Sequence, residues 1–129
     1  MSSSSPTPEA IFTAFRASML ANDGRWEDLI ADDVKLSAPL AQVEGRDAFI
    51  ELNRPFFASI RESELHRKVV SGPYVVTEIT TTVAAPGSVE FPLDVSEWYE
   101  IRHGKITALR TYFDASALRA QAAAEHTQP

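Results

Sequence analysis

Cysteine is absent from the 129-residue sequence, and histidine occurs only three times. Without cysteine the chain can form neither a disulfide nor a thiolate zinc site. The histidines, His66, His103 and His126, lack the close spacing that is typical of a metal-binding motif. We therefore expect neither a metal site nor a bound cofactor.

Long apolar runs and clustered positive charge are also absent. No apolar stretch approaches the roughly 18 residues of a membrane span, and the opening MSSSSPTPEA lacks both the basic and the apolar region of a secretory signal. Twelve Lys and Arg residues are scattered among eighteen Asp and Glu residues, which gives a net charge of −6, so a nucleic-acid backbone would be repelled. These absences predict a cytoplasmic protein with neither a membrane nor a nucleic-acid partner.

The remaining composition is that of an ordinary globular domain. Hydrophobic residues make up 44% of the chain and charged residues 23%, and a chain of this length folds around one core. We expect a single domain over residues 1–129, with a flexible leader at 1–6 and a flexible tail at 126–129.

The first half of the chain shows a helical spacing of apolar residues. Thr7-Pro8-Glu9 combines an N-cap, a proline at the first helical position and a first-turn acid, and predicts a helix that ends near Asp23-Gly24. A second, short helix is expected at 26–31 and a third stripe at 49–60. Within this stripe, Pro55 predicts a kink or a break into two abutting helices.

The second half is rich in β-branched and aromatic residues separated by turn signals. The alternating pattern predicts one strand between the helices and four after them, at 33–38, 65–71, 74–84, 89–101 and 105–113. An alanine-rich segment predicts a final helix at 115–125. Helices followed by hairpin-linked strands predict an α+β fold, in which a strongly curved antiparallel sheet wraps around the N-terminal helices.

Alternation along the fourth strand of this set places a single carboxyl group, that of Glu97, on an otherwise apolar face. The neighbouring strands place Thr77, Thr81 and Thr111 on apolar faces as well. Because each buried carboxyl or hydroxyl group needs a hydrogen-bond partner, this grouping predicts a ligand cavity. Two alternatives stay open: a one-residue slip after Pro92 would turn Glu97 to solvent, and the threonines are also ordinary strand formers.

Three stretches of the sequence carry a resemblance to a known family. They are APLAQVEGRDAF at 38–49, YVVTEITTTV at 74–83 and EIRHGKITALRTYFD at 100–114. In order and over nearly the whole chain, they resemble the limonene epoxide hydrolase and SnoaL-like branch of the nuclear transport factor 2-like superfamily. The resemblance implies a cone-shaped α+β barrel with a deep, mostly apolar pocket and frequent dimerisation, but it does not specify the reaction, because this superfamily hosts many functions.

The catalytic residues of limonene epoxide hydrolase are not matched. In that family an arginine between two aspartates, helped by a tyrosine and an asparagine, activates water and protonates the epoxide. The resemblance places the arginine on Ile79, the aspartates on Thr81 and Thr111, and the tyrosine and asparagine on Lys35 and Ser37. With no carboxylate at these positions, we expect no epoxide hydrolysis by that route.

A second relative, ketosteroid isomerase, is similar at IADDVKLSAP, residues 30–39. Its general-base aspartate falls on Ala38 and its oxyanion-hole tyrosine close to Phe15, so both groups are missing. The acid that donates a hydrogen bond in its pocket aligns with Glu97. Strand alternation and resemblance therefore indicate the same residue.

We predict a pocket in which Glu97 is the catalytic carboxyl group and Lys35 a second catalytic candidate, although simple alternation in its strand would turn Lys35 to solvent. Trp26 is expected either in the core or in the pocket wall. The predicted ligand-binding residues are Phe15, Met19, Trp26, Phe56, Ile60, Thr77, Ile79, Thr81, Leu93, Val95, Tyr99, Leu109 and Thr111.

The leading hypothesis is an enzyme that acts on a hydrophobic metabolite by acid–base chemistry, as an isomerase, a cyclase or a hydrolase. The alternatives are a catalytically silent protein that binds an apolar small molecule, and a mainly structural dimer. Val76, Trp98 and Tyr112 fall on the sheet face opposite the pocket and predict a homodimer interface there.

Overall fold

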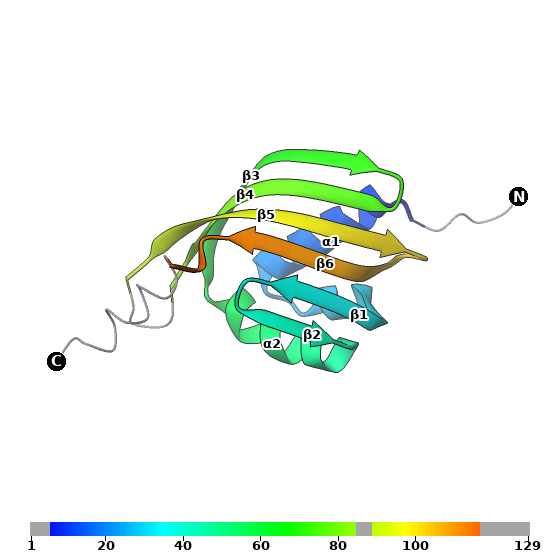
Figure 1. The fold of residues 1–129 in the computed structure, drawn as a ribbon, viewed down its shortest axis with the longest axis horizontal. Coiled ribbons are helices and arrows are strands. Elements are labelled where there is room, and N and C mark those ends of the chain that lie inside the picture. Colours follow the sequence, from blue (N-terminus) through cyan, green and yellow to red (C-terminus); the bar gives the residue numbers. More distant parts are fainter. Residues whose placement is uncertain (1–5, 85–88, 117–129) are drawn as a thin grey trace, which may run out of the picture.

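The computed structural model describes residues 6–84 and 89–116, arranged as Figure 1 shows. Most of the predicted leader, the predicted final helix beyond Ser116 and the predicted tail lie outside the described residues. In chain order the elements are α1 (Pro8–Ala21), the 3-10 helix η1 (Arg25–Leu29), β1 (Ile30–Ala38), β2 (Ala41–Glu44), α2 (Arg46–Ala58), β3 (Ile60–Ser71), β4 (Tyr74–Val83), β5 (Phe91–Arg102) and β6 (Lys105–Phe113).

The strands form one curved sheet in the order β2-β1-β6-β5-β4-β3, and the helices cover one of its faces (Figure 1). Helix α1 packs against β3, β4 and β5, whereas α2 packs against β1 and β2. The predicted α+β fold, with a curved sheet around helices, is confirmed.

The sheet is mixed rather than wholly antiparallel, which corrects the prediction. Strand β1 pairs with β6 in parallel, with Leu36 opposite Leu109, while the other pairs are antiparallel. Parallel neighbours need a long crossover, and the chain between β1 and β6 supplies one. Helix α2 lies within this crossover, so the helices do not all precede the sheet.

The helices follow their predicted signals in part. The hydroxyl of Thr7 accepts a hydrogen bond from the backbone N–H of Ala10 at 3.1 Å, as expected for the N-cap of α1. The second helix is a short 3-10 turn, because Ile30 already pairs with Ile106 in the sheet. Helix α2 continues through Pro55 as one helix, in place of two abutting ones.

The last strand has the predicted bounds, and β4 and β5 differ from theirs by one or two residues. Strand β3 begins five residues earlier than expected, at Ile60, which had been assigned to the helical stripe. The backbone N–H of Ser59 ends α2 by bonding to Phe56 and Pro55, which frees the next residue to enter the sheet. Strand β2 was not predicted, since four residues are too few to show a clear alternation.

An aromatic cluster joins the helices to the inner sheet face. Phe15 packs edge-on against Trp26, Phe57 and Tyr99, with ring centroids 5.8 to 6.1 Å apart. Such contacts contribute about 0.5–1.5 kcal/mol each beyond the burial of apolar area. The cluster fixes α1 and α2 over β5, the strand that carries Glu97 and Tyr99.

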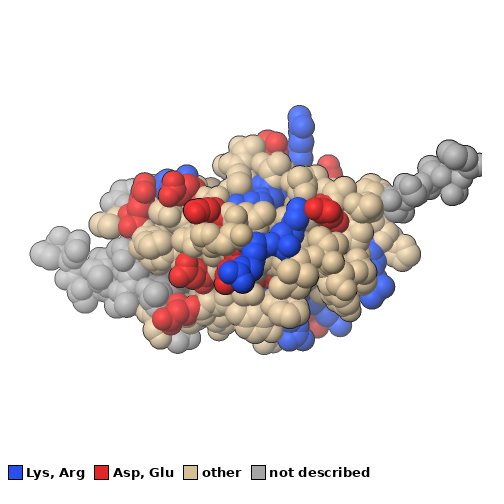
Figure 2. Space-filling view, turned by 90° about the horizontal axis from the view of Figure 1, so that it is seen from above, with Lys and Arg blue, Asp and Glu red and all other residues tan. Residues whose placement is uncertain are grey.

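Strand β3 forms one edge of the sheet, and charged residues cover it. Figure 2 looks onto this side and shows basic side chains near the middle, flanked by acidic ones. Lysine and arginine side chains of this strand form ion pairs with neighbouring elements: Arg67 with Glu78 at 3.2 Å and Lys68 with Glu9 at 2.7 Å. Charges on an edge strand discourage pairing with other chains.

Among the described residues, no helix is long and apolar enough to cross a membrane.

Candidate functional site

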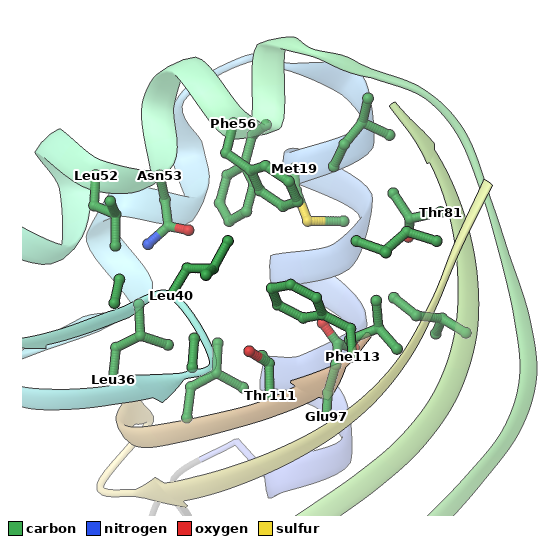
Figure 3. Close-up of a pocket in the computed structure, with 18 of the residues that line it drawn as sticks. Met19, Leu36, Leu40, Leu52, Asn53, Phe56, Thr81, Glu97, Thr111 and Phe113 are labelled. Atoms are coloured by element: carbon green, nitrogen blue, oxygen red, sulfur yellow. The ribbon is translucent and has the colours of Figure 1, made fainter. Parts of the chain in front are cut away.

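A cavity of about 270 Å³ lies between the inner face of the sheet and the two α-helices (Figure 3). This volume is near the lower end of the roughly 300–1,000 Å³ that is typical of small-molecule pockets. Leu40, Leu52 and Phe56 line the cavity and are still 38 to 44% exposed, so they surround its opening. The wall is otherwise largely apolar and consists of Phe15, Met19, Leu36, Ala38, Leu40, Ala41, Leu52, Asn53, Phe56, Phe57, Ile60, Ile79, Thr81, Leu93, Val95, Glu97, Tyr99, Leu109, Thr111 and Phe113.

The predicted ligand-binding residues lie in this wall, with two exceptions. Trp26 is 2% exposed and belongs to the core, where its ring lies 4.9 Å from that of Phe57. Thr77 is buried beside Glu97 on the neighbouring strand and is not one of the wall residues. Whether the wall residues bind a ligand stays a prediction.

Lys35 is not a pocket residue, and this corrects the second catalytic candidate. Val34 and Leu36 are buried, and Lys35 between them is exposed on the opposite face of β1. Its strand partners there are Glu44 and Ala108. Simple alternation decides its direction, so it cannot pair with Glu97 inside the cavity.

Glu97 points inward from β5, in the predicted register. Pairing between β4 and β5 runs without a shift past Pro92, so the slip that would have exposed Glu97 does not occur. The residue is 8% exposed, and Trp98 beside it is 50% exposed on the outer face. The same register places Thr77 and Thr111 directly across from Glu97 on the two neighbouring strands.

Both oxygens of the Glu97 carboxyl group accept hydrogen bonds from protein hydroxyls. The Thr77 hydroxyl donates to Oε1 at 2.8 Å, and the Tyr99 phenol donates to Oε2 at 2.9 Å. Burial raises the pKa of Glu97 above its ordinary value of 4.5, while these two hydrogen bonds and the charge of Arg16 oppose the rise. Desolvation is the largest influence, because burial removes the water that would stabilise the anion.

Tyr99 stays a neutral donor over the physiological range. Burial raises its pKa well above 10, and the nearby negative charge of Glu97 adds to the rise. Glu97 and Tyr99 are the ionisable residues of the described wall. Of these two residues, Glu97 is therefore the candidate proton donor or acceptor.

Arg16 was not predicted from the sequence, because it flanks the apolar stripe of α1, where a charged residue is usually exposed. Its guanidinium donates to the backbone carbonyl of Ser63 at 2.9 Å, and it is partly buried between α1 and β3. It is absent from the cavity wall. Its charge nevertheless lowers the pKa of Glu97.

Three further polar side chains face the cavity. The Thr81 hydroxyl is engaged with that of Ser63 at 2.9 Å, whereas the hydroxyl of Thr111 has no hydrogen-bond partner among the described residues. Asn53 of α2 was expected only as part of a helical stripe. A polar residue within an apolar stripe is the signal that could have identified it.

The wall also contains apolar residues that were not predicted, and most come from β1, β2 and the connection between them. The sequence did not identify them because it did not predict the parallel pairing of β1 with β6, which brings these residues to the cavity. Among the described residues, no group of three or more His, Cys, Asp or Glu side chains could hold a metal ion.

Comparison with known proteins places this site in a family. The family model for the SnoaL-like domain matches residues 9–109. No curated protein matches the chain.

Several solved structures share the fold. A protein from Kribbella flavida DSM 17836 is similar with a TM-score of 0.83 and 18% identity, over 97% of this chain and 100% of that one. A putative SnoaL-like polyketide cyclase from Jannaschia sp. CCS1 has a TM-score of 0.76 and 16% identity, over 94% and 96% of the two chains. An epoxide hydrolase from M. tuberculosis, described as similar to limonene epoxide hydrolase, has a TM-score of 0.74 and 23% identity, over 86% and 85%. The solved structures show that the chain shares their fold, and the matched residues 9–109 show that it belongs to the SnoaL-like domain family.

Proposed function

We propose that this protein is an enzyme that moves a proton within a small, hydrophobic metabolite. The observation that carries the proposal is Glu97, a buried carboxyl group that lines an apolar cavity and has a raised pKa. A carboxylate with a raised pKa is a stronger base than an exposed glutamate, and its conjugate acid is populated closer to neutral pH. Perturbed groups of this kind cluster at functional sites.

Isomerisation or cyclisation fits the wall better than hydrolysis. A single carboxylate can take a proton from a carbon next to a carbonyl group and return it to another carbon. The second transfer regenerates the carboxylate, so no other acid–base group is needed. Hydrolysis must also activate a water molecule, and the described wall offers no second acid–base group besides Tyr99. Neighbours in fold include a putative polyketide cyclase and a putative isomerase, which is consistent with this choice.

The wall also argues against the route of limonene epoxide hydrolase. That route needs an arginine and two aspartates, and the described wall contains neither residue type. Ile79, Thr81 and Thr111, where the resemblance would place them, all line the cavity. Their side chains cannot carry the charge or the proton that this reaction requires.

A catalytically silent binding protein is the second candidate. One observation favours it: both Glu97 oxygens are already engaged by Thr77 and Tyr99, as in a carboxyl group whose role is structural. In that case the cavity would bind an apolar molecule without chemistry, and Glu97 would only tie β4 to β5.

Conversion of 3-cyclohexen-1-one to 2-cyclohexen-1-one separates the two candidates. In this reaction the base takes a proton from C2, the double bond moves into conjugation with the carbonyl group, and the proton is added at C4. Glu97→Gln keeps the side-chain shape, and an enzyme should lose roughly 100- to 10,000-fold in rate. Glu100→Gln, on the outer side of the same strand, is the matched control and should keep the wild-type rate. If the wild type binds the ketone but is no faster than Glu97→Gln, the protein is a binder.

A further inference from the structure

Asn53 is a polar side chain in the wall of the cavity that the proton transfer does not use. It lies on α2, is 8% exposed, and shares the buried side of this helix with Phe49, Ile50 and Phe57. Figure 3 shows it across the cavity from Glu97, since the two come from the helix and from the sheet. A leucine at this position would continue the apolar stripe.

The orientation of the Asn53 amide is set by its neighbour. Its Nδ2 donates to the backbone carbonyl of Phe49 at 2.9 Å, one turn earlier in the same helix. A carbonyl oxygen can only accept a hydrogen bond, so the group that faces it must be the NH₂ and not the amide oxygen. The nitrogen is thereby held at the helix backbone, and Oδ1 is the atom left to face elsewhere.

Oδ1 of Asn53 is open to the cavity. No hydrogen bond to it exists among the described residues, yet every fully buried side-chain nitrogen or oxygen of these residues has a partner. The Oδ1 atom must therefore have accessible surface, and the surface next to Asn53 is the cavity that it lines (Figure 3). The hydrogen bond to the Phe49 carbonyl explains the position of Nδ2, but it gives no role to the acceptor atom Oδ1.

We infer that Asn53 determines specificity, by accepting a hydrogen bond from a hydroxyl or N–H group of the ligand. The inference rests on the proposed function, because it requires that a small molecule occupies this cavity. It adds the class of molecule: a compact alicyclic or aromatic compound with a hydrogen-bond donor on the side of the ligand that faces α2. A site built to pair with a donor rejects an analogue that lacks one, because its own polar atom then stays unpaired. Glu97 acts on the other side of the same ligand.

Three ring compounds of similar size test this inference: cyclohexanol carries a donor, cyclohexanone only an acceptor, and methylcyclohexane neither. Affinities are measured by calorimetry for the wild type, Asn53→Leu and Asn53→Asp. The wild type should prefer cyclohexanol over cyclohexanone. In Asn53→Leu the ratio of the cyclohexanol to the methylcyclohexane affinity should fall roughly 5- to 100-fold. Asn53→Asp keeps an acceptor oxygen but loses the N–H that holds the side chain at the Phe49 carbonyl, so it should retain only part of the preference for the alcohol.

The outcomes separate this inference from the proposed function. Equal affinities of the wild type for all three compounds, or an unchanged ratio in Asn53→Leu, overturn the role of Asn53, while conversion of the enone by Glu97 still stands. Loss of Glu97-dependent conversion with an intact preference for cyclohexanol overturns the proton transfer and keeps the acceptor. If Asn53→Leu does not fold, the wild-type order of affinities decides, and a preference for cyclohexanone overturns the inference.

Discussion

Glu97→Gln should change how the stability of the protein depends on pH. Burial holds the pKa of Glu97 above 4.5 in the folded state, whereas the unfolded chain returns it to about this value. Between the two values the folded protein keeps a proton that the unfolded chain has released. Because stability falls with pH wherever the folded state binds more protons, the contribution of Glu97 is fully present below the unfolded pKa and is lost as pH rises through the folded pKa.

The size of the effect follows from this linkage. Each pH unit between the unfolded and the folded pKa of Glu97 removes about 1.4 kcal/mol from the free energy of unfolding. Glutamine has no proton to lose, so this slope disappears in Glu97→Gln. Its amide can still meet the hydroxyls of Thr77 and Tyr99, each of which can also accept a hydrogen bond. A poorer fit should cost about 0.5–1.5 kcal/mol at every pH.

The two plots of stability against pH should therefore converge as the pH rises. At pH 4 the variant should be slightly less stable than the wild type, and with rising pH it should become relatively more stable until Glu97 is fully ionised. Urea unfolding at constant protein concentration, in half-unit steps from pH 4 to pH 9, measures both curves. The difference between them isolates Glu97, since all other titrating groups are shared.

Glu100→Gln provides a control of opposite sign on the same strand. The hydrogen bond from Thr107 and, more weakly, the charge of Arg102 lower the pKa of Glu100. The stability that Glu100 contributes is present above its pKa in the unfolded chain and is lost as the pH falls through its pKa in the folded protein. The free energy of unfolding of Glu100→Gln should therefore differ from that of the wild type at neutral pH and approach it in acid. Parallel curves for the wild type and Glu97→Gln over the whole range would refute the reasoning, because a desolvated carboxyl group must titrate differently in the two states.

Three other predictions follow from the sheet, the cavity wall and α1. We propose a homodimer through the outer sheet face, where Trp98 and Tyr112 are 50% and 52% exposed; Trp98→Ala should weaken it in sedimentation at micromolar concentration, and a monomeric wild type would contradict it. The wild type should form no diol from limonene oxide above background, measured by gas chromatography, and clear diol formation would show that another group activates water. Arg16→Gln should raise the pKa of Glu97 further, because the charge of Arg16 lowers it; the rise should be small, and an unchanged carboxyl NMR titration would show that this charge is screened.

The sheet faces could be predicted from the sequence because their signal is local. Strict alternation along β5 identified the direction of Glu97, and the same alternation in β1 would have placed Lys35 outside. The bounds of β6 were predicted correctly, since turn residues precede it and an aspartate follows it. Register within hairpins depends on neighbours in the sequence, so it can be inferred without knowledge of the rest of the fold.

Contacts between distant elements could not be predicted in this way. The parallel pairing of β1 with β6 brings Leu36 and Ala38 to the cavity, and no turn signal announces such a pairing. Arg16 and Asn53 lie on helices whose spacing predicts only which side is buried. Which group each one faces depends on the packing of the helices against the sheet.

The charges around Glu97 argue for an uncharged ligand. With Lys35 on the outer face and Arg16 bound to the carbonyl of Ser63, the described wall contains no cation. An anionic ligand would meet an apolar wall and a carboxyl group, with nothing in that wall to compensate its lost hydration. A cationic ligand would pair with Glu97, lower its pKa and hold it ionised, so that the same group could no longer return the proton it had taken. A neutral molecule with one hydrogen-bond donor leaves Glu97 free to alternate between its two forms, and only that alternation allows a single carboxyl group to act as both base and acid.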